Sequence, residues 1–266
     1  MPYLELRDGL PLYYEEHGEG SPIVLVPGWT ITTPFWERQV DDLAYDHHVV
    51  TLDLRGAGNS GKTPEGHSLA SYADDLDELL RGLELFDVTL VGFAMGVSVS
   101  AHYLVAHTNE RVARFVWVDH SPHFFVAPGW PYALFGDLTP QRLEETLRRL
   151  WHDRPQVTRE LLGVMFAPEE AWMLPELMKT PTEVATAMLA AVASVDLRPM
   201  MPRLDLPVLL VNGRRSVVPY EVGGWLEEHL PRSRCIVLDG GHAPFWDDAA
   251  AFNTSVREFA AGHHVR

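Results

Sequence analysis

Short, largely apolar runs recur along the chain, and most of their members are β-branched or aliphatic. Because a strand that is covered on both faces reads as such a run, each one predicts a buried strand. The runs lie at Ile23–Val26, Val49–Asp53, Val88–Val91, Phe115–Val118, Pro207–Val211 and Cys235–Leu238. Apolar residues at helical spacing predict helices between and after the runs, for example over 71–85 and 252–260. The alternation of strands and helices predicts an α/β fold with a mainly parallel, doubly wound sheet.

The alternation stops between residues 121 and 204, where no strand-like run occurs. Helical patterns fill this segment instead, and a helix-start signal such as Thr139-Pro140 supports them. The patterns cover Thr139–His152, Gln156–Phe166, Pro168–Lys179 and Thr182–Val195. We therefore interpret residues 121–204 as a helical cap inserted into a core that is formed by residues 1–120 and 205–266.

Composition and charge narrow the possible partners. The 266 residues carry a formal net charge of -16, which repels nucleic acid and anionic membrane surfaces, so neither is an expected partner. No window approaches the ~20 apolar residues that a membrane span needs, and the N-terminus lacks the basic and apolar regions of a signal peptide. The single Cys235 excludes an intramolecular disulfide and fits a reducing compartment. We expect a cytoplasmic monomer or homodimer.

The stretch Gly92-Phe93-Ala94-Met95-Gly96 carries the most information about chemistry. It follows a predicted strand and opens a helical pattern. This is the setting of the G-x-S-x-G nucleophile elbow, a tight turn that presents a nucleophile to the active site. Here the central position is Ala94, and a methyl group cannot attack a carbonyl carbon. We therefore predict that the turn is present and that no acyl-enzyme forms at Ala94.

Three further motifs flank the elbow. They are Val26-Pro27-Gly28-Trp29, Asp53-Leu54-Arg55-Gly56-Ala57-Gly58-Asn59-Ser60 and Gly240-Gly241-His242-Ala243-Pro244. They resemble the oxyanion loop, the D-x-R-G-x-G-x-S segment and the G-H-x-P histidine loop of the α/β-hydrolase fold. With the elbow, they extend this resemblance over nearly the whole chain. Because the fold hosts many chemistries, function has to be argued from the site.

The chain departs from the usual hydrolase pattern at the acid that supports the histidine. Most such hydrolases carry an Asp after strand 7, in a pattern like G-x-x-D-x-x-V-P. This chain reads Gly213-Arg214-Arg215-Ser216-Val217-Val218-Pro219 there and has no carboxylate. A carboxylate stands instead at Asp119, at the end of the sixth strand. The acid at this place, with His242 and no serine nucleophile, resembles the cofactor-independent 3-hydroxy-4(1H)-quinolone 2,4-dioxygenases.

The oxyanion loop supports the resemblance to the dioxygenases, whereas the elbow departs from their pattern. Pro27-Gly28-Trp29 resembles the P-G-W of the dioxygenases at the same loop. However, that family commonly has Ser at the position of Ala94 and His at the positions of Phe93 and Met95. The more apolar elbow of this chain favours a larger or more apolar substrate, such as a 2-alkyl-3-hydroxy-4-quinolone with a heptyl chain.

The resemblance implies a role for each site residue. His242 is the general base, since imidazole accepts a proton near neutral pH, and Asp119 orients its ring. The backbone N–H groups of Trp29 and Met95 form an oxyanion hole. After His242 removes the 3-hydroxyl proton, O2 attacks the substrate anion, and ring cleavage releases carbon monoxide and an N-acylanthranilate. The expected partners are this aromatic heterocycle and O2, with no cofactor and no metal.

Aromatic side chains stack well on an aromatic bicycle, so we expect Trp29, Phe93, Phe135 and Trp151 to line the substrate pocket. Core packing is the alternative for each cap aromatic.

Several polar residues have structural alternatives. Asp119 could be a turn residue or a helix cap, since Asp is common at strand ends. Asp53 and Arg55 more often form a structural loop network than a catalytic one. His120 and His123 are near enough to Asp119 to be polar contacts of the site, although a structural or solvent-facing position is the usual one for each.

Two other functions remain open at this point. The first is an esterase-like or epoxide-type hydrolase whose nucleophile has been replaced by Ala94. The second is a ligand binder without catalysis, although such a protein has no need of His242 and Asp119 as a base and its orienting partner.

Overall fold

The computed structural model describes residues 3–107, 110–166 and 170–262, which contain an eight-stranded sheet in the order β1-β2-β4-β3-β5-β6-β7-β8. The pairs β1–β2 and β2–β4 are antiparallel, and the other neighbours are parallel. The strands are β1 (Tyr3–Glu5), β2 (Pro11–His17), β3 (Ser21–Val26), β4 (His47–Leu52), β5 (Val88–Phe93), β6 (Val112–Val118), β7 (Val208–Gly213) and β8 (Ser233–Leu238). The predicted apolar runs fall on β3 to β8, so the expected α/β fold with a mainly parallel sheet is confirmed.

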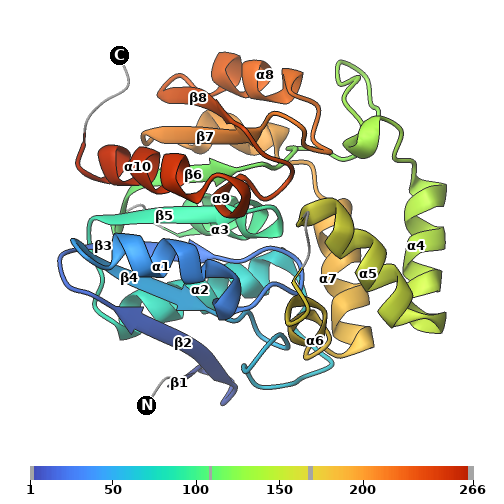
Figure 1. Cartoon of the computed structure of the whole chain (residues 1–266), viewed down its shortest axis with the longest axis horizontal. Coiled ribbons are helices and arrows are strands. Elements are labelled where there is room, and N and C mark those ends of the chain that lie inside the picture. The colour runs from blue at the N-terminus through green and yellow to red at the C-terminus, as the bar shows by residue number, and fades with distance from the viewer. Residues whose placement is uncertain (1–2, 108–109, 167–169, 263–266) are drawn as a thin grey trace.

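Helices cover both faces of this sheet (Figure 1). The α-helices are α1 (Glu37–Leu43), α2 (Leu69–Gly82), α3 (Met95–Ala106), α4 (Pro140–His152), α5 (Arg154–Met165), α6 (Met173–Leu177), α7 (Thr182–Ala193), α8 (Glu221–His229), α9 (Pro244–Asp247) and α10 (Ala249–Ala260). Short 3₁₀ helices lie at Thr33–Trp36, Leu134–Gly136 and Arg198–Arg203.

Alternate residues of one central strand show how the two layers arise. Val24 and Val26 of β3 pack in a core with residues of α2, α3 and α8, whereas Ile23 and Leu25 pack in a second core with residues of α1, α9 and α10. Successive side chains of a strand point to opposite faces. Since all four are fully buried, an uninterrupted apolar run is what this strand requires.

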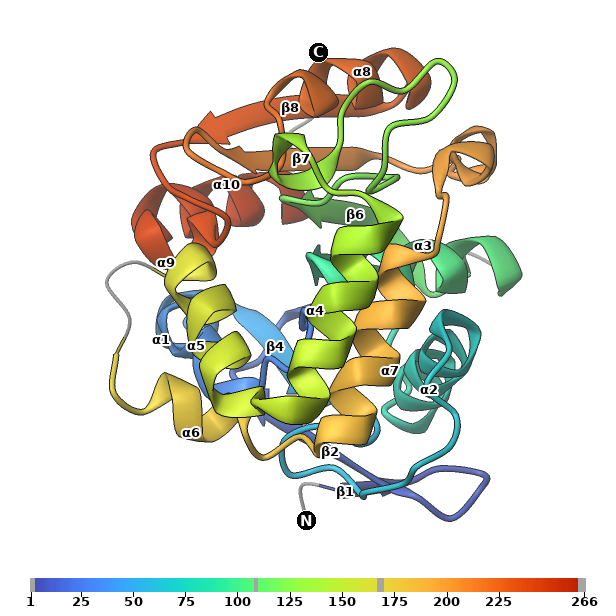
Figure 2. The same cartoon turned by 90° about the vertical axis from the view of Figure 1, so that its right-hand side faces the viewer.

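Helices α4 to α7 follow β6 in the chain and gather at one end of the sheet, where Figure 2 looks onto them. Two buried side chains tie them in place. The indole N–H of Trp29, just after β3, donates to the carbonyl oxygen of Ala185 in α7 at 2.7 Å. The guanidinium of Arg154 in α5 donates to the carbonyl oxygens of Leu177 and Thr180. The α4–α7 segment therefore lies over the carboxyl ends of the parallel strands.

One predicted helix is shorter than expected. The pattern over 168–179 forms a helix only at α6, Met173–Leu177, and residues 167–169 lie outside the described residues. Pro175 explains the late start, because proline has no N–H and its ring clashes with the carbonyl four residues earlier, so it is tolerated only in a first helical turn.

Among the described residues, no helix is both long and apolar enough to cross a membrane.

Candidate active site

The tight turn after β5 has the geometry of a nucleophile elbow. Ala94 has φ 47° and ψ -117°, a strained conformation for a residue with a side chain, and α3 begins directly after it. Two glycines allow the turn. A Cβ on Gly96 would lie 2.2 Å from the carbonyl oxygen of Val26, and one on Gly92 would lie 2.7 Å from the carbonyl oxygen of Gly96. The predicted turn is therefore present, with a methyl group at its tip.

A second loop places the carboxylate. Asp119 follows β6, is fully buried and also has a positive φ, 46°. Its Oδ1 accepts the backbone N–H of Gly213 at 2.9 Å, and its Oδ2 accepts the hydroxyl of Ser216. These two donors hold the carboxylate from the loop after β7. Ser216 stands where the strand-7 pattern of many hydrolases has its Asp. In this chain the residue at that position donates a hydrogen bond to Asp119, the carboxylate that follows β6.

His242 completes the dyad from the loop after β8. Its Nδ1 lies 2.6 Å from Oδ2 of Asp119, a short hydrogen bond between a ring nitrogen and a carboxylate. Its ring packs beside Phe93, with the ring centroids 5.1 Å apart. No hydrogen-bond partner for Nε2 occurs in the part of the chain that the structure describes. The arrangement therefore fixes one ring nitrogen and leaves the other to act on a ligand.

The dyad opens into an apolar cavity of about 110 Å³. Its wall comes from the strand ends and from the helices above them. The lining residues are Trp29, Phe93, Ala94, Met95, His120, Phe124, Leu134, Phe135, Leu161, Val164, Met165, Leu189, Val192, Val217, Val218 and His242. Such a cavity, apolar with a few polar groups, is typical of a small-molecule site.

Three of the four residues predicted for the substrate pocket line this cavity, namely Trp29, Phe93 and Phe135. The prediction for Trp151 is wrong. Its side chain is 59 % exposed on α4 and is not part of the cavity wall. The preceding residue, Leu150, is fully buried. One step along an α-helix turns the side chain by about 100°, which is enough to move Trp151 from the interior to the solvent.

The predicted oxyanion hole has a favourable backbone arrangement. Met95 is the first residue of α3, where the N–H groups have no partner within the helix. The loop that carries Trp29 packs against the elbow, since a Cβ on Gly28 would lie 3.3 Å from the Cβ of Ala94. Trp29 and Met95 both line the cavity. Their role as oxyanion donors stays a prediction.

His120, one of the two histidines that the sequence left open as polar contacts of the site, is a cavity residue. It is buried in the wall, and its Nε2 lies 2.8 Å from the hydroxyl oxygen of Ser98. Burial, with a smaller contribution from nearby His242, lowers the pKa of His120 to about 3. The ring is therefore neutral at physiological pH. By contrast, His123 is half-buried and lies outside the wall.

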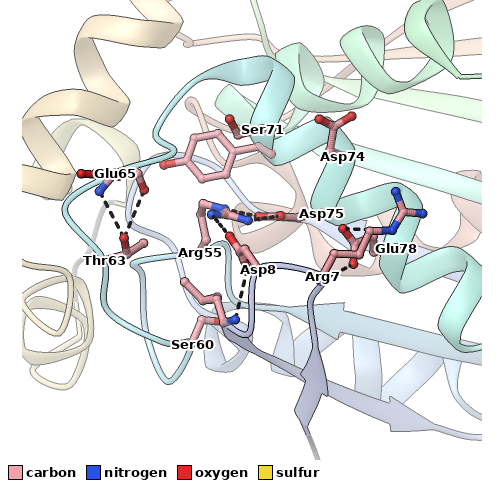
Figure 3. A network of polar contacts seen from close by, with 12 residues as sticks. Arg7, Asp8, Arg55, Ser60, Thr63, Glu65, Ser71, Asp74, Asp75 and Glu78 are labelled. Atoms are coloured by element: carbon pink, nitrogen blue, oxygen red, sulfur yellow. Dashed lines mark hydrogen bonds and ion pairs between the residues drawn. The ribbon is translucent and has the colours of Figure 1, made fainter.

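Asp53 and Arg55 of the D-x-R-G-x-G-x-S segment have structural partners away from the cavity. Asp53 accepts two backbone N–H groups, each at 2.7 Å, and burial raises its pKa to about 6. The guanidinium of Arg55 forms two hydrogen bonds with Asp75 and one with Asp8, which Figure 3 shows at the centre of a polar network. Neither residue lines the cavity.

Comparison with known proteins supplies the family. A model of the alpha/beta hydrolase fold matches residues 21–249 of this chain. The chain belongs to the α/β hydrolase family. A pimeloyl-[acyl-carrier protein] methyl ester esterase from Vibrio campbellii is 29 % identical over 94 % of this chain and 98 % of its own length. A putative non-heme chloroperoxidase from Synechocystis is 28 % identical over 97 % and 99 %, respectively.

A solved structure agrees with this membership. An esterase from Exiguobacterium antarcticum superposes with a TM-score of 0.91 at 25 % identity and covers 97 % of this chain and 98 % of its own. The family is one of enzymes, and the relatives named here are esterases and a putative peroxidase. Within the described residues of this α/β hydrolase, no group of three or more His, Cys, Asp or Glu side chains is placed to hold a metal ion.

Proposed function

We propose that this α/β hydrolase works without a covalent intermediate, with His242 acting as a general base directly on the contents of the cavity. One observation carries the proposal: an intact His242–Asp119 dyad opens into a cavity whose elbow position carries only a methyl group. Without a nucleophile beside it, the dyad can still act as a general base, because His242 can remove a proton from a ligand or from a water molecule in the cavity. A general base of this kind contributes about 10²- to 10⁴-fold.

Hydrolysis of an ester is the reaction that the esterase relatives favour, and the apolar cavity suits an ester with an apolar acyl or aryl group. In this scheme, a water molecule takes the place of the missing hydroxyl beside Ala94, and Nε2 of His242 removes its proton as the oxygen adds to the carbonyl carbon. The N–H groups of Trp29 and Met95 hold the resulting oxyanion. The intermediate then expels the alcohol, which takes the proton from His242. Sites that lack a triad member retain about 10³- to 10⁴-fold catalysis over water, which the oxyanion hole and substrate binding supply.

A second reaction is favoured by the acid at Asp119 after β6, together with Pro27-Gly28-Trp29. In the cofactor-free cleavage of a 3-hydroxy-4(1H)-quinolone by O2, the acidic proton is on the substrate itself. His242 would remove it, and the ring would lose carbon monoxide to give an N-acylanthranilate. The apolar lining of the cavity suits the 2-alkyl members of this class. This reaction needs a base and a dry pocket, but no nucleophile.

One experiment separates the two reactions. The purified protein is incubated with 4-nitrophenyl esters from acetate to octanoate, and in parallel with 3-hydroxy-2-methyl-4(1H)-quinolone with and without oxygen. Ester hydrolysis above the buffer rate, with no acyl adduct in the intact mass, supports the hydrolytic route. Oxygen-dependent loss of the quinolone with release of carbon monoxide supports the second. If neither substrate turns over, the enzyme proposal is overturned in favour of a ligand binder.

A further inference from the structure

The cavity wall contains a second imidazole that the proposed reactions do not use. Apart from His242, the polar side-chain groups of the lining residues are the indole of Trp29 and the ring of His120. The indole N–H is already satisfied, because it donates to the carbonyl oxygen of Ala185 at 2.7 Å. His120 is therefore the one remaining polar side chain in the described lining that can recognise a ligand.

His120 is held firmly in one orientation. Its Nε2 lies 2.8 Å from the hydroxyl oxygen of Ser98 in α3, and its backbone carbonyl oxygen accepts the indole N–H of Trp117 at 2.8 Å. Its ring packs edge-to-face with that of Phe124, with 5.3 Å between the ring centroids. A side chain held by packing and by a hydrogen bond loses little further freedom when a ligand binds.

The hydrogen bond to Ser98 indicates where the ring proton sits. The Ser98 hydroxyl is fully buried, and His120 is its partner among the described residues. A buried hydroxyl hydrogen without an acceptor is costly, so the hydroxyl donates to Nε2. A neutral imidazole whose Nε2 accepts a hydrogen bond carries its proton on Nδ1.

The Nδ1 atom is the ring nitrogen of His120 that remains for a ligand. It has no hydrogen-bond partner in the described part of the protein, and it is not among the buried polar atoms that are sealed off without one. The 2 % of His120 that is accessible therefore includes this atom, and the cavity is the space that His120 borders. An N–H group in an apolar wall is stabilised only when an acceptor arrives.

We propose that His120 is a specificity-determining residue that donates a hydrogen bond from Nδ1 to an acceptor oxygen of the ligand. The ligand class is then a small molecule, aromatic or alkyl in most of its surface, with a carbonyl or similar oxygen apart from the atom on which His242 acts. The inference deepens the proposed function, because it concerns the ligand of the same cavity. It is tested by binding, so that its failure and that of the proposed reaction can be told apart.

The test compares two ligands of nearly the same shape, acetophenone, which has a carbonyl oxygen, and ethylbenzene, which has none. Their dissociation constants are measured by calorimetry for the wild type, for His120→Phe and for the control His123→Gln, which changes a histidine outside the wall. We expect the preference for acetophenone over ethylbenzene to fall about 3- to 10-fold in His120→Phe, as for the loss of one hydrogen bond. The preference should be unchanged in His123→Gln.

An unchanged preference in His120→Phe overturns the proposal, and so does a failure of both ligands to bind the wild type. If His120→Phe does not fold, His120→Gln and His120→Met replace it. Glutamine keeps a donor and should keep the preference, whereas methionine lacks one and should lose it. Turnover in the wild type with an unchanged preference would reject the role of His120 alone. A changed preference without turnover would reject the proposed reaction alone.

Discussion

His242 and Asp119 lie 123 positions apart in the chain, yet Nδ1 of one is 2.6 Å from Oδ2 of the other. The parallel sheet explains the meeting, because β6 and β8 both border β7 and end at the same edge. Asp119 and His242 follow these two strands, and Gly213 at the end of β7 donates its N–H to the carboxylate. The ends of three neighbouring strands therefore position the two residues of the dyad.

Replacing the carboxylate should disable the base without unfolding the protein. In Asp119→Asn, the amide no longer fixes the ring of His242 in the tautomer that leaves Nε2 free. We expect kcat/KM to fall by about 10²- to 10⁴-fold on whichever substrate turns over. Steady-state kinetics measures the fall, and circular dichroism checks the fold. A variant with the wild-type rate would show that Asp119 does not orient the base.

A carboxylate in the loop after β7 should restore part of the activity that Asp119→Asn loses. Ser216 already donates a hydrogen bond to Asp119, from the position where many hydrolases carry their acid. Adding Ser216→Asp to Asp119→Asn restores a carboxylate within reach of the dyad. We expect the double variant to regain at least about tenfold of the lost rate. A double variant no faster than Asp119→Asn would mean that this position cannot replace Asp119.

A serine at the elbow should create a conventional nucleophile. The turn at Ala94 keeps the strained geometry of the elbow, and Ala94 and His242 line the same cavity. Ala94→Ser should therefore give a burst of 4-nitrophenol from 4-nitrophenyl esters, with an acyl adduct in the intact mass. The wild type should show neither. Absence of the adduct in Ala94→Ser would indicate that His242 cannot reach the elbow side chain.

Acid should destabilise the protein partly through His120. Burial lowers its pKa from an ordinary value of 6.5 to about 3 in the folded state. The unfolded chain therefore binds the proton first. This contribution to stability is complete above pH 6.5 and is lost as the pH falls from 6.5 toward 3, at up to about 1.4 kcal/mol per pH unit.

Chemical denaturation between pH 4 and 8 measures this effect. His120→Phe should lose part of the decline in unfolding free energy below pH 6.5, whereas His123→Gln should follow the wild type. Identical pH profiles for His120→Phe and the wild type would show that His120 is not a buried neutral group.

Two exposed aromatic residues between β6 and β7 should differ in their effect on binding. Phe135 lines the cavity although it is 42 % exposed, whereas Trp151 is 59 % exposed and lies outside the wall. Phe135→Ala should weaken the binding of acetophenone, because it removes part of the wall. Trp151→Ala should leave binding unchanged and alter the unfolding free energy by no more than about 0.5 kcal/mol. Weaker binding in Trp151→Ala would show that Trp151 contacts the ligand after all.

The sequence predicts the sheet and the elbow well, for a physical reason. Buried parallel strands require uninterrupted apolar runs, and the turn at Ala94 requires glycines at 92 and 96, so both leave strong local signals. The motif resemblance also predicts the pairing of Asp119 with His242, because the fold places the ends of their strands at the same edge of the sheet.

Helices α4 to α7 leave weaker signals in the sequence. Leu150 and Trp151 are adjacent and both apolar, so the pattern alone does not say which of them faces the interior of α4. The position of His120 is a tertiary property as well. It depends on Ser98 in α3 and on residues of α5 and α7 that line the same cavity, and neither is visible in the local sequence.

The central claim is that His242 removes a proton directly, with no acyl-enzyme. Its most direct test compares kcat/KM of the wild type and of His242→Gln on the substrate that turns over, with the acetophenone dissociation constant measured beside it. We predict a fall of about 10²- to 10⁴-fold in kcat/KM, with the dissociation constant little changed. A His242→Gln protein that retains the wild-type rate would contradict the account.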